Sequence, residues 1–425
     1  MPPDTTIPGT LRLWTTLQLA WRNLARNRRR TWISAVTVAF ALFLLQISSA
    51  MLIGLERQSF DNLINYQTAH AKLFAESYFE QREDYPLDLT LADLDALQQR
   101  VRAVEGVAAA TPRLSFSAQL SNGVEQVPCL GTGILIAGSD NDVFRIPTAV
   151  VAGSYLQPGE EGMLLGSGLA AFFEVAPGDW LTVLAKTRDG AYEAVDLEVV
   201  GLIGTGNPLI DQSTFLVSME TARFMLDMED QATEIAVRFA PAAGESATLR
   251  RLVQSLTDVK GLEVKGWKEV EADFMALVQT KRTGNTIFLG LFVLIAVVGI
   301  TNTILMATFE RIREIGALMG MGLRGSGIRR IFLMEGMLTG LLGGGIGTLM
   351  ALGVIAYFAT NGIDFSAMYG DMDIGYPVKD VIYMAILPGQ LLTTWLLTGV
   401  LAAGAAYYPA ARASRLNPAE ALRYV

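Results

Sequence analysis

Long apolar segments alternate with charged segments along this chain. Residues 31–55 and 283–309 contain no charged side chain, and the segments 331–360 and 387–411 are almost as apolar. A helix needs about 20 consecutive apolar residues to cross the ~30 Å hydrocarbon core of a bilayer. The pattern therefore predicts four membrane-spanning helices, with a long polar region, residues 56–282, between the first and the second.

A single apolar segment has other interpretations. It can be a buried core helix, and residues 31–55 could also be a removable signal peptide, cut near Ser48 and Ala50. The apolar part of a signal peptide has about 7 to 15 residues. The segment 31–55 is longer and begins deeper in the chain than such a peptide, so we interpret it as a retained span.

Arginines mark one side of the predicted spans. Lys and Arg near span ends stay in the cytoplasm, so the segments that hold these arginines, and both termini, are predicted to be cytoplasmic. Residues 56–282, with 33 acidic and 18 basic residues, are predicted to be extracytoplasmic. Arginines at span ends indicate contact with membrane lipids, not with nucleic acid. The arginines concerned are Arg12, Arg22, Arg26, Arg28, Arg29, Arg30, Arg311, Arg313, Arg324, Arg329, Arg330, Arg412, Arg415 and Arg423.

A helical pattern also precedes the first span. Apolar residues recur at helical spacing from Leu13 to Leu24, which predicts an amphipathic helix in the cytoplasmic membrane interface, with Trp14, Trp21 and Trp32 as interface residues. The alternative is an ordinary packed helix. The predicted order is an interfacial helix (1–30), span one (31–55), an extracytoplasmic domain (56–282), span two (283–309), a cytoplasmic loop (310–330), span three (331–360), a short extracytoplasmic loop (361–386), span four (387–411) and a cytoplasmic tail (412–425).

The region between the first two spans has a mixed α and β pattern. The whole chain is 51% hydrophobic and 18% charged, and its apolar residues are concentrated in the predicted spans. The region between the first two spans is nevertheless long enough to form a hydrophobic core of its own. Residues Leu89 to Val104 predict a helix with Thr90 as its N-cap. Residues 127–136, 180–185 and 194–203 predict strands, and 219–228 a short helix. The fold class is therefore a membrane protein with four transmembrane helices and a large mixed α/β domain between the first and second spans.

The sequence contains no recognisable set of catalytic residues. Cys129 and His70 are the only cysteine and histidine, too few for a metal site or a convincing catalytic pair. A phosphate-binding loop, G-x-x-x-x-G-K-[ST], does not occur, since Lys186 and Thr187 lack the preceding glycine. We expect no catalytic residue, no metal and no directly bound cofactor. If the protein uses ATP, a partner hydrolyses it.

The loop after the second predicted span offers a place for such a partner. Charged residues begin at Glu310, and Ile315, Leu318 and Met319 then form an apolar stripe at helical spacing. A short helix of this kind can sit in a groove of another protein. The alternative is a charged turn between two spans.

Several segments resemble one family, the FtsX-like permeases, which include the macrolide-exporter and lipoprotein-releasing permeases. The segment E-R-I-R-E-I-G-A-L-M-G-M-G from Glu310 looks like the signature after the second span of that family. Five other segments are also similar to the sequences of that family. They are the C-terminal Y-P-A-A-R-A-S-R-L-N-P-A-E-A-L-R-Y from Tyr408, the N-terminal L-A-W-R-N-L-A-R-N-R-R-R-T, and, in the region between the first two spans, G-M-L-L-G-S-G-L-A from Gly162, P-G-D-W-L from Pro177 and V-V-G-L-I from Val199.

The resemblance implies the permease subunit of an ABC transporter in the bacterial inner membrane. In that family a permease pairs with a second copy, identical or not, and engages a cytoplasmic ATPase, which uses ATP and Mg²⁺, through a coupling helix. Movements are thought to pass to the outer domain. The residues that match the coupling region are Glu310, Arg311, Arg313, Glu314, Ile315, Gly316, Leu318 and Gly322.

The layout narrows these expectations further. Only about 30 residues precede the first span, so we expect a separate ATPase, as in lipoprotein-releasing permeases. The expected substrate is a lipoprotein or another amphiphilic molecule of the envelope, with a periplasmic partner as a further candidate. Two other classes stay open: a membrane-anchored sensor or regulator, and a membrane-bound enzyme, which the lack of a catalytic constellation disfavours.

Overall fold

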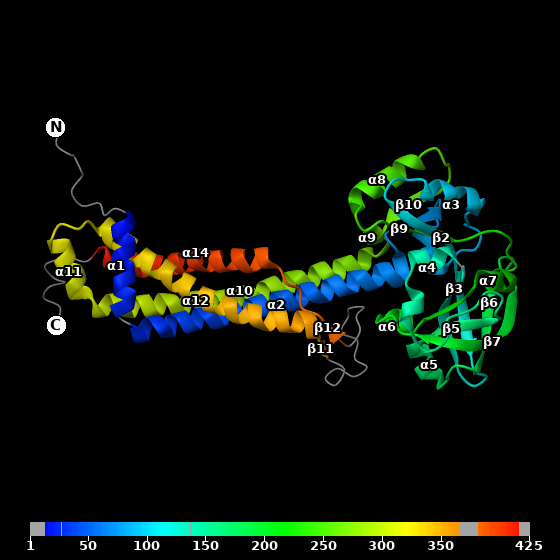
Figure 1. The fold of residues 1–425 in the computed structure, drawn as a ribbon, viewed down its shortest axis with the longest axis horizontal. Helices are drawn as coiled ribbons and strands as arrows, with labels where there is room; N and C mark the ends of the chain where they lie inside the picture. The colour runs from blue at the N-terminus through cyan, green and yellow to red at the C-terminus, as the bar shows by residue number, and fades with distance from the viewer. Residues whose placement is uncertain (1–12, 27, 137, 365–380, 416–425) are drawn as a thin grey trace. The chain divides into compact units, whose positions relative to one another are not determined.

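The chain folds into two compact units. The computed structural model describes residues 13–26, 28–136, 138–364 and 381–415 (Figure 1). The helical unit comprises Met1–Gly54, Gln279–Ile363 and Tyr383–Val425, and the α/β unit comprises Leu55–Val278 and Asp364–Ile382. Outside the described residues lie 1–12 of the predicted interfacial segment, 365–380 of the predicted loop 361–386, and 416–425 of the predicted tail and C-terminal motif.

Within the part of the chain that the structure describes, four helices are long and apolar enough to cross a membrane. They confirm the predicted fold class, with the α/β unit between the first and the second of them. The first and second extend past the predicted spans as continuous helices, from residue 55 to 63 and from 272 to 282. The helices of this part of the chain are α1 (Leu13–Arg26), α2 (Arg28–Leu63), α10 (Ala272–Glu310), α11 (Ile312–Gly320), α12 (Gly325–Asn361) and α14 (Pro388–Ala413).

Glycines let α12 lie close to two other helices. A Cβ on Gly340 would come within 2.5 Å of the Cβ of Ala402 in α14, and one on Gly347 within 2.4 Å of the carbonyl oxygen of Ala39 in α2. Small residues of this kind allow close helix contact in lipid, where the hydrophobic effect does not drive association. The indole N–H of Trp395 also donates to the carbonyl oxygen of Leu341 at 2.9 Å, which joins α12 and α14.

The α/β unit is built on one branched sheet. The strand path is β10-β1-β9-β2-β3-β8-β5-β7-β4, and β6 pairs with both β2 and β7. The strands are β1 (Ala71–Ala75), β2 (Val107–Ser121), β3 (Gln126–Ile134), β4 (Val150–Gly153), β5 (Gly162–Gly166), β6 (Trp180–Lys186), β7 (Tyr192–Ile203), β8 (Thr214–Ser218), β9 (Glu234–Phe239) and β10 (Leu262–Gly266). The short strands β11 (Ile363–Asp364) and β12 (Val381–Ile382) form a separate pair.

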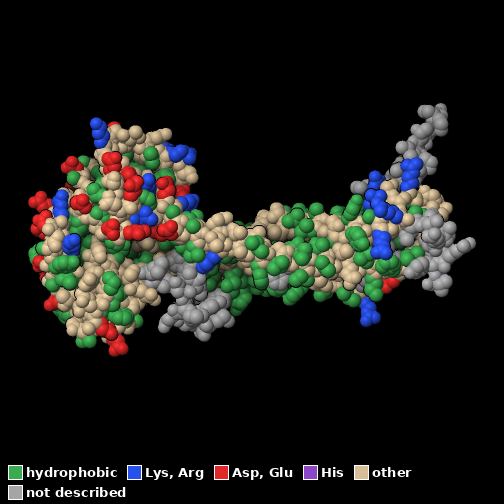
Figure 2. Space-filling model, turned by 180° about the vertical axis from the view of Figure 1, so that it is seen from behind, with side chains coloured by type: hydrophobic (Ala, Val, Ile, Leu, Met, Phe, Trp, Pro, Cys, Tyr) green, Lys and Arg blue, Asp and Glu red, His purple; other side chains and the backbone are tan. Residues whose placement is uncertain are grey.

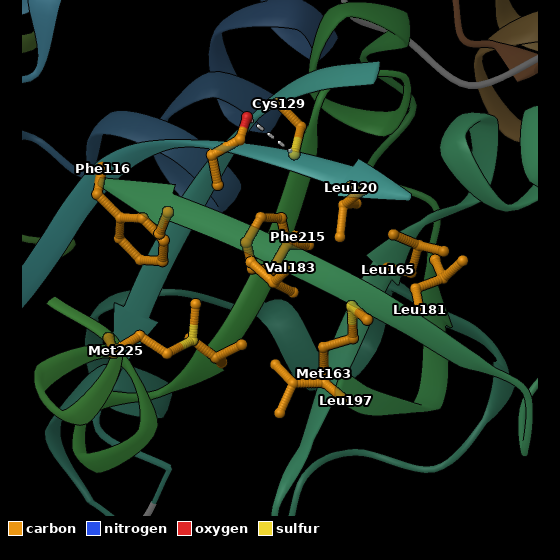
Figure 3. Packing of buried hydrophobic residues seen from close by; sticks show 14 of the residues in the cluster. Phe116, Leu120, Cys129, Met163, Leu165, Leu181, Val183, Leu197, Phe215 and Met225 are labelled. Carbon is orange, nitrogen blue, oxygen red and sulfur yellow. Dashed lines mark hydrogen bonds between the residues drawn. The ribbon is translucent and has the colours of Figure 1, made fainter. Parts of the chain in front are cut away.

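Strands β2, β3, β8, β5, β7 and β6 pair in a closed ring around an apolar core. Phe116 and Phe215 meet edge to face there, with ring centroids 5.9 Å apart, and side chains from β5, β6 and β7 fill the remaining space (Figure 3). The ring accounts for the three predicted strands, which correspond to β3, β6 and β7. Helices α5 (Ser167–Phe173) and α7 (Met219–Leu226) contribute to this core, and α7 fits the predicted short helix.

At the other end of the strand path from β4, strands β10, β1, β9 and the first half of β2 carry α3 (Leu94–Arg102) and α8 (Glu245–Ser255) over a second core. The prediction that Thr90 caps a helix from residue 89 is wrong. Leu91 exchanges backbone hydrogen bonds with Ala232 and is therefore extended, and the Thr90 hydroxyl bonds to Gln231 instead. Shorter helices in this unit are α4 (Ser139–Val143), α6 (Pro208–Asp211) and α9 (Trp267–Val270), with η1 (Ile64–Thr68), η2 (Phe79–Asp84) and η3 (Ile146–Ala149).

Candidate functional site

The connection between the second and third long helices contains a defined short helix, α11. Its C-terminal end closes with two backbone bonds, from Gly322 N–H to Met319 and from Leu323 N–H to Leu318. This is the Schellman arrangement, which needs a left-handed residue after the helix. Gly322 fills that position with φ +94°, a conformation that costs glycine little. The sequence therefore gives the loop a fixed turn into α12.

The apolar stripe of α11 packs inside the helical unit. Ile315 is only 4% exposed and lies in a cluster with Phe332 of α12 and Ala410 of α14, with Leu318 and Met319 at its edge. Ile315 therefore faces α12 and α14 and not a partner, which differs from the docking stripe that the sequence pattern predicted, while Leu318 and Met319 are only partly buried. The exposed face of α11 carries Arg313, Glu314 and other residues instead.

A chain of ionic and polar contacts holds α11 to α1 and α12. Arg311, at the N-cap of α11, lies 3.3 Å from the carboxylate of Glu335 in α12, and both side chains are less than 10% exposed. The Asn23 amide of α1 donates to that same carboxylate at 2.6 Å. At the surface, Glu314 contacts Arg26 of α1 at 2.6 Å and Arg311 at 3.8 Å. We call these five residues the α11 network.

Burial makes the inner part of the network sensitive to change. Removing one partner of a buried ion pair leaves an uncompensated charge, which costs about 3–5 kcal/mol. The outer pair of Arg26 and Glu314 is half exposed, and pairs of that kind contribute little. The network therefore fixes the position of α11 mainly through Arg311 and Glu335.

The structure brings the predicted coupling residues together in different ways. Arg311 and Glu314 join the α11 network, Ile315, Gly316 and Leu318 lie on the inner side of α11, and Gly322 makes the turn. Glu310 and Arg313 are exposed at the end of α10 and on α11. These observations describe where the eight residues lie, and their role in coupling to an ATPase stays a prediction.

Three network members were missed from the sequence. Arg26 served only as evidence for orientation, and Asn23 was not singled out. Glu335 could have been found, because a lone carboxylate at the start of a predicted span is a functional candidate by itself.

The lone cysteine and histidine have structural surroundings. Cys129 is buried in the core inside the closed ring of strands. Its thiol donates to the Ala118 carbonyl oxygen at 3.6 Å, and burial raises the pKa of the thiol to about 12. His70 stacks on Phe239, and its Nδ1 accepts the backbone N–H of that residue at 3.3 Å. Burial, with the nearby Arg238, lowers the pKa of His70 to about 4. A neutral imidazole is thus part of the fold.

This imidazole predicts a pH dependence. Since the pKa of His70 is lower in the folded chain than in the unfolded chain, the unfolded state binds more protons between about pH 6.5 and 4, and stability falls as the pH falls through that window. Relative to His70→Gln, wild type should lose on the order of 2 kcal/mol between pH 7 and 4, after allowance for partial exposure. Denaturant titration of the full-length protein in detergent measures this difference. Parallel pH curves for the two proteins would contradict it.

A polar cavity of about 350 Å³ lies within the α/β unit. Part of its charged lining is paired: Lys72 lies 2.8 Å from Glu234, and the Arg113 guanidinium makes two bonds to Asp140. Buried pairs of this kind are hydrogen-bonded parts of the fold. Among the residues that the structure describes, no group of three or more His, Cys, Asp or Glu side chains could hold a metal ion.

The fold and the α11 loop define a multi-span membrane protein with a large α/β domain after its first span. Known proteins of this kind match it. The family model described as MacB-like periplasmic core domain matches residues 31–255, and the model described as FtsX-like permease C-terminal matches residues 286–418. The chain belongs to the FtsX-like ABC transporter permeases with a MacB-like periplasmic core domain, which confirms the resemblance in its sequence.

Several known proteins are similar to this chain. The lipoprotein-releasing system transmembrane protein LolC of Neisseria meningitidis is 25% identical over 95% of this chain and 99% of the relative. LolE of Haemophilus influenzae is 24% identical over 95% and 98%. The macrolide export ATP-binding/permease protein MacB of Hahella chejuensis is 36% identical over 29% of this chain and 16% of the relative. The crystal structure of the periplasmic region of MacB from Actinobacillus actinomycetemcomitans has 15% identity and a TM-score of 0.36, covering 51% of this chain and 97% of that one.

Proposed function

We propose that this chain is the inner-membrane subunit through which a separate ATPase drives movements of the periplasmic domain. ATP and Mg²⁺ are then used by that ATPase and not by this chain. The observation that carries the proposal is the α11 network, which holds an exposed short helix to α1 and α12 through buried contacts. In this proposal both termini and residues 310–330 lie in the cytoplasm, because these segments contain the arginines next to the ends of the spans.

The ATPase docks on the exposed side of α11 and its turn. Arg313 and Glu314 are exposed there, and Met321 is 76% exposed at the tip of the turn. Methionine adapts to irregular partner surfaces, and exposed charges set the orientation of docking. The inner side of α11 contributes stability to this surface and not direct contact, since Ile315 is buried in the chain.

Motion of α11 passes to the span α12 through Arg311 and Glu335. This contact is buried and short, so a displacement of α11 that kept α12 fixed would break an ion pair. Close glycine contacts then join α12 to α2 and α14. In turn, α2 and α10 are continuous helices that extend into residues of the α/β unit, and continuous helices transmit displacement over their length.

Relatives that align along nearly the whole chain support a proposal for the substrate class. LolC and LolE are described as parts of lipoprotein-releasing systems, and the alignment with them covers nearly all of each chain. We therefore infer release of a lipoprotein or another amphiphilic envelope molecule. A second permease copy, identical or related, completes the transporter in this proposal.

The proposal predicts a partner that depends on the exposed face of α11. Purification of the tagged full-length chain from its native membrane in mild detergent should recover an ATPase, identified by mass spectrometry. Arg313→Glu and Met321→Asp should each lower its recovery at least about ten-fold, because a reversed charge and a buried carboxylate cost more than about 1.4 kcal/mol at an interface.

The matched control is Lys186→Glu, a charge reversal at an exposed position of the α/β unit, which should leave recovery unchanged. Equal recovery of the ATPase with all three variants would place docking elsewhere. Recovery of a kinase without an ATPase would overturn the proposal in favour of a sensor or regulator.

A further inference from the structure

A groove of about 380 Å³ lies between α1, α2 and α12, at the end of the helical unit where basic side chains gather (Figure 2). Its volume falls within the range of about 300–1,000 Å³ that holds small molecules. The walls are apolar except for one guanidinium and one hydroxyl. The larger side chains of the lining are those of Trp21, Leu24, Arg28, Trp32, Leu342 and Ile346.

A hydrogen bond between α1 and α2 supports the shape of this groove. The hydroxyl of Thr31 in α2 donates to the carbonyl oxygen of Leu24 in α1 at 3.1 Å, so the only hydroxyl in the lining already has a partner. The buried side of α1, which includes Ala20 at 0% exposure, packs against α12. The groove is therefore a formed feature of three packed helices and not a gap at a loose end.

Charge decides which apolar molecule fits. Arg28 lines the groove, and Arg22 and Arg29 lie exposed nearby in sequence. No acidic side chain lines the groove among the residues that the structure describes. Trp21 and Trp32 are more than half exposed beside it, as is typical of tryptophans at the level of lipid headgroups. An occupant must therefore combine an apolar chain with an anionic head at the membrane surface.

We infer that this groove binds one acyl chain of an anionic glycerophospholipid whose phosphate contacts Arg28. The acyl chain lies between α1 and the apolar side chains of Leu342 and Ile346, and the headgroup stays at the level of the two tryptophans. Such a lipid joins α1 to α12 next to the α11 network. Lipid binding at this site requires insertion in a membrane and does not require an ATPase, so it can be tested independently of the proposed function.

Native mass spectrometry of the full-length protein in detergent tests this inference, with phosphatidylglycerol and phosphatidylcholine as probes. Wild type should retain one phosphatidylglycerol in preference to phosphatidylcholine. Arg28→Gln should weaken retention of phosphatidylglycerol about five-fold, the effect expected for one basic residue at an anionic headgroup, and leave phosphatidylcholine unchanged. Ala25→Phe, which places a ring in the groove from an exposed position of α1, should abolish one-to-one retention of both lipids.

Two matched controls separate a built site from general attraction. Arg29→Gln removes the neighbouring charge, and Val36→Phe adds a ring at an exposed position of α2 outside the groove lining. Both should retain the lipid as wild type does. The inference is overturned if Arg28→Gln and Arg29→Gln weaken retention equally, or if Ala25→Phe retains phosphatidylglycerol. Equal retention of the two lipids by wild type would also overturn it.

Discussion

Replacement of Arg311 by methionine is expected to lower the free energy of unfolding by about 3–5 kcal/mol, because it leaves the Glu335 carboxylate buried without its cation. Glu335→Met should lower the free energy of unfolding by a similar amount, because it leaves the Arg311 guanidinium buried without the Glu335 carboxylate. The double variant should recover most of this loss, since two apolar side chains of similar volume replace the pair. Reversible denaturation of the full-length protein in mixed micelles measures all three changes.

Arg313→Met is the control, because it makes the same substitution two positions away on the exposed side of α11. We expect a change within about 0.5 kcal/mol there. Additive costs in the double variant would show that the two side chains do not act as a pair. If the double variant is stable and still recovers the ATPase, the proposed function predicts that ATP hydrolysis no longer responds to substrate, because the contact proposed to transmit the motion of α11 is gone.

Gly340→Leu is expected to prevent normal assembly of the helical unit. The first added carbon alone would lie 2.5 Å from the Cβ of Ala402 and 2.9 Å from the Thr398 carbonyl oxygen, so α12 and α14 would have to separate. Overpacking of this kind costs about 1–3 kcal/mol in cores that can adjust, and backbone on the opposing side limits adjustment here. Size-exclusion chromatography of the detergent-extracted protein should show loss of most of the monodisperse peak.

The same helix supplies the control. A Cβ on Gly353 would meet nothing within 4 Å, so Gly353→Leu should keep wild-type yield and chromatographic behaviour. Gly340→Ala should give an intermediate loss, because it adds only the first clashing carbon. Normal assembly of Gly340→Leu would mean that α12 and α14 do not approach as closely as these distances require.

The spans and their order were readable from the sequence because hydrocarbon imposes a length and a polarity on any segment that crosses it. The strands β3, β6 and β7 were also found, since runs of β-branched and apolar residues bounded by Gly, Pro or Asp are a local property of the sequence. The ends of the helices were not. Thr90 has every local feature of an N-cap, but a backbone pairing between Leu91 and Ala232, far apart in sequence, prevents the helix from starting there.

The candidate site was found only in part, for a related reason. The charged start of α11 was visible as a pattern, but which charges are buried depends on helices far away in the chain. Arg311 meets Asn23 and Glu335 only after α1 and α12 have packed together. In the same way Ile315 looked like a docking residue because its cover comes from Phe332 and Ala410. Periodicity shows that a helix has an apolar face and does not show what covers it.

The glycines of α12 restrict how that helix can move. Gly340 lies against α14, and Gly347, about two turns further along the same side of α12, lies against α2. A rotation of α12 about its own axis would turn larger side chains toward both neighbours, so we expect α12 to move together with α2 and α14. The span of α10 has far less of its surface buried than the other three. We therefore expect relative motion within the helical unit to occur mainly between α10 and the other three long helices.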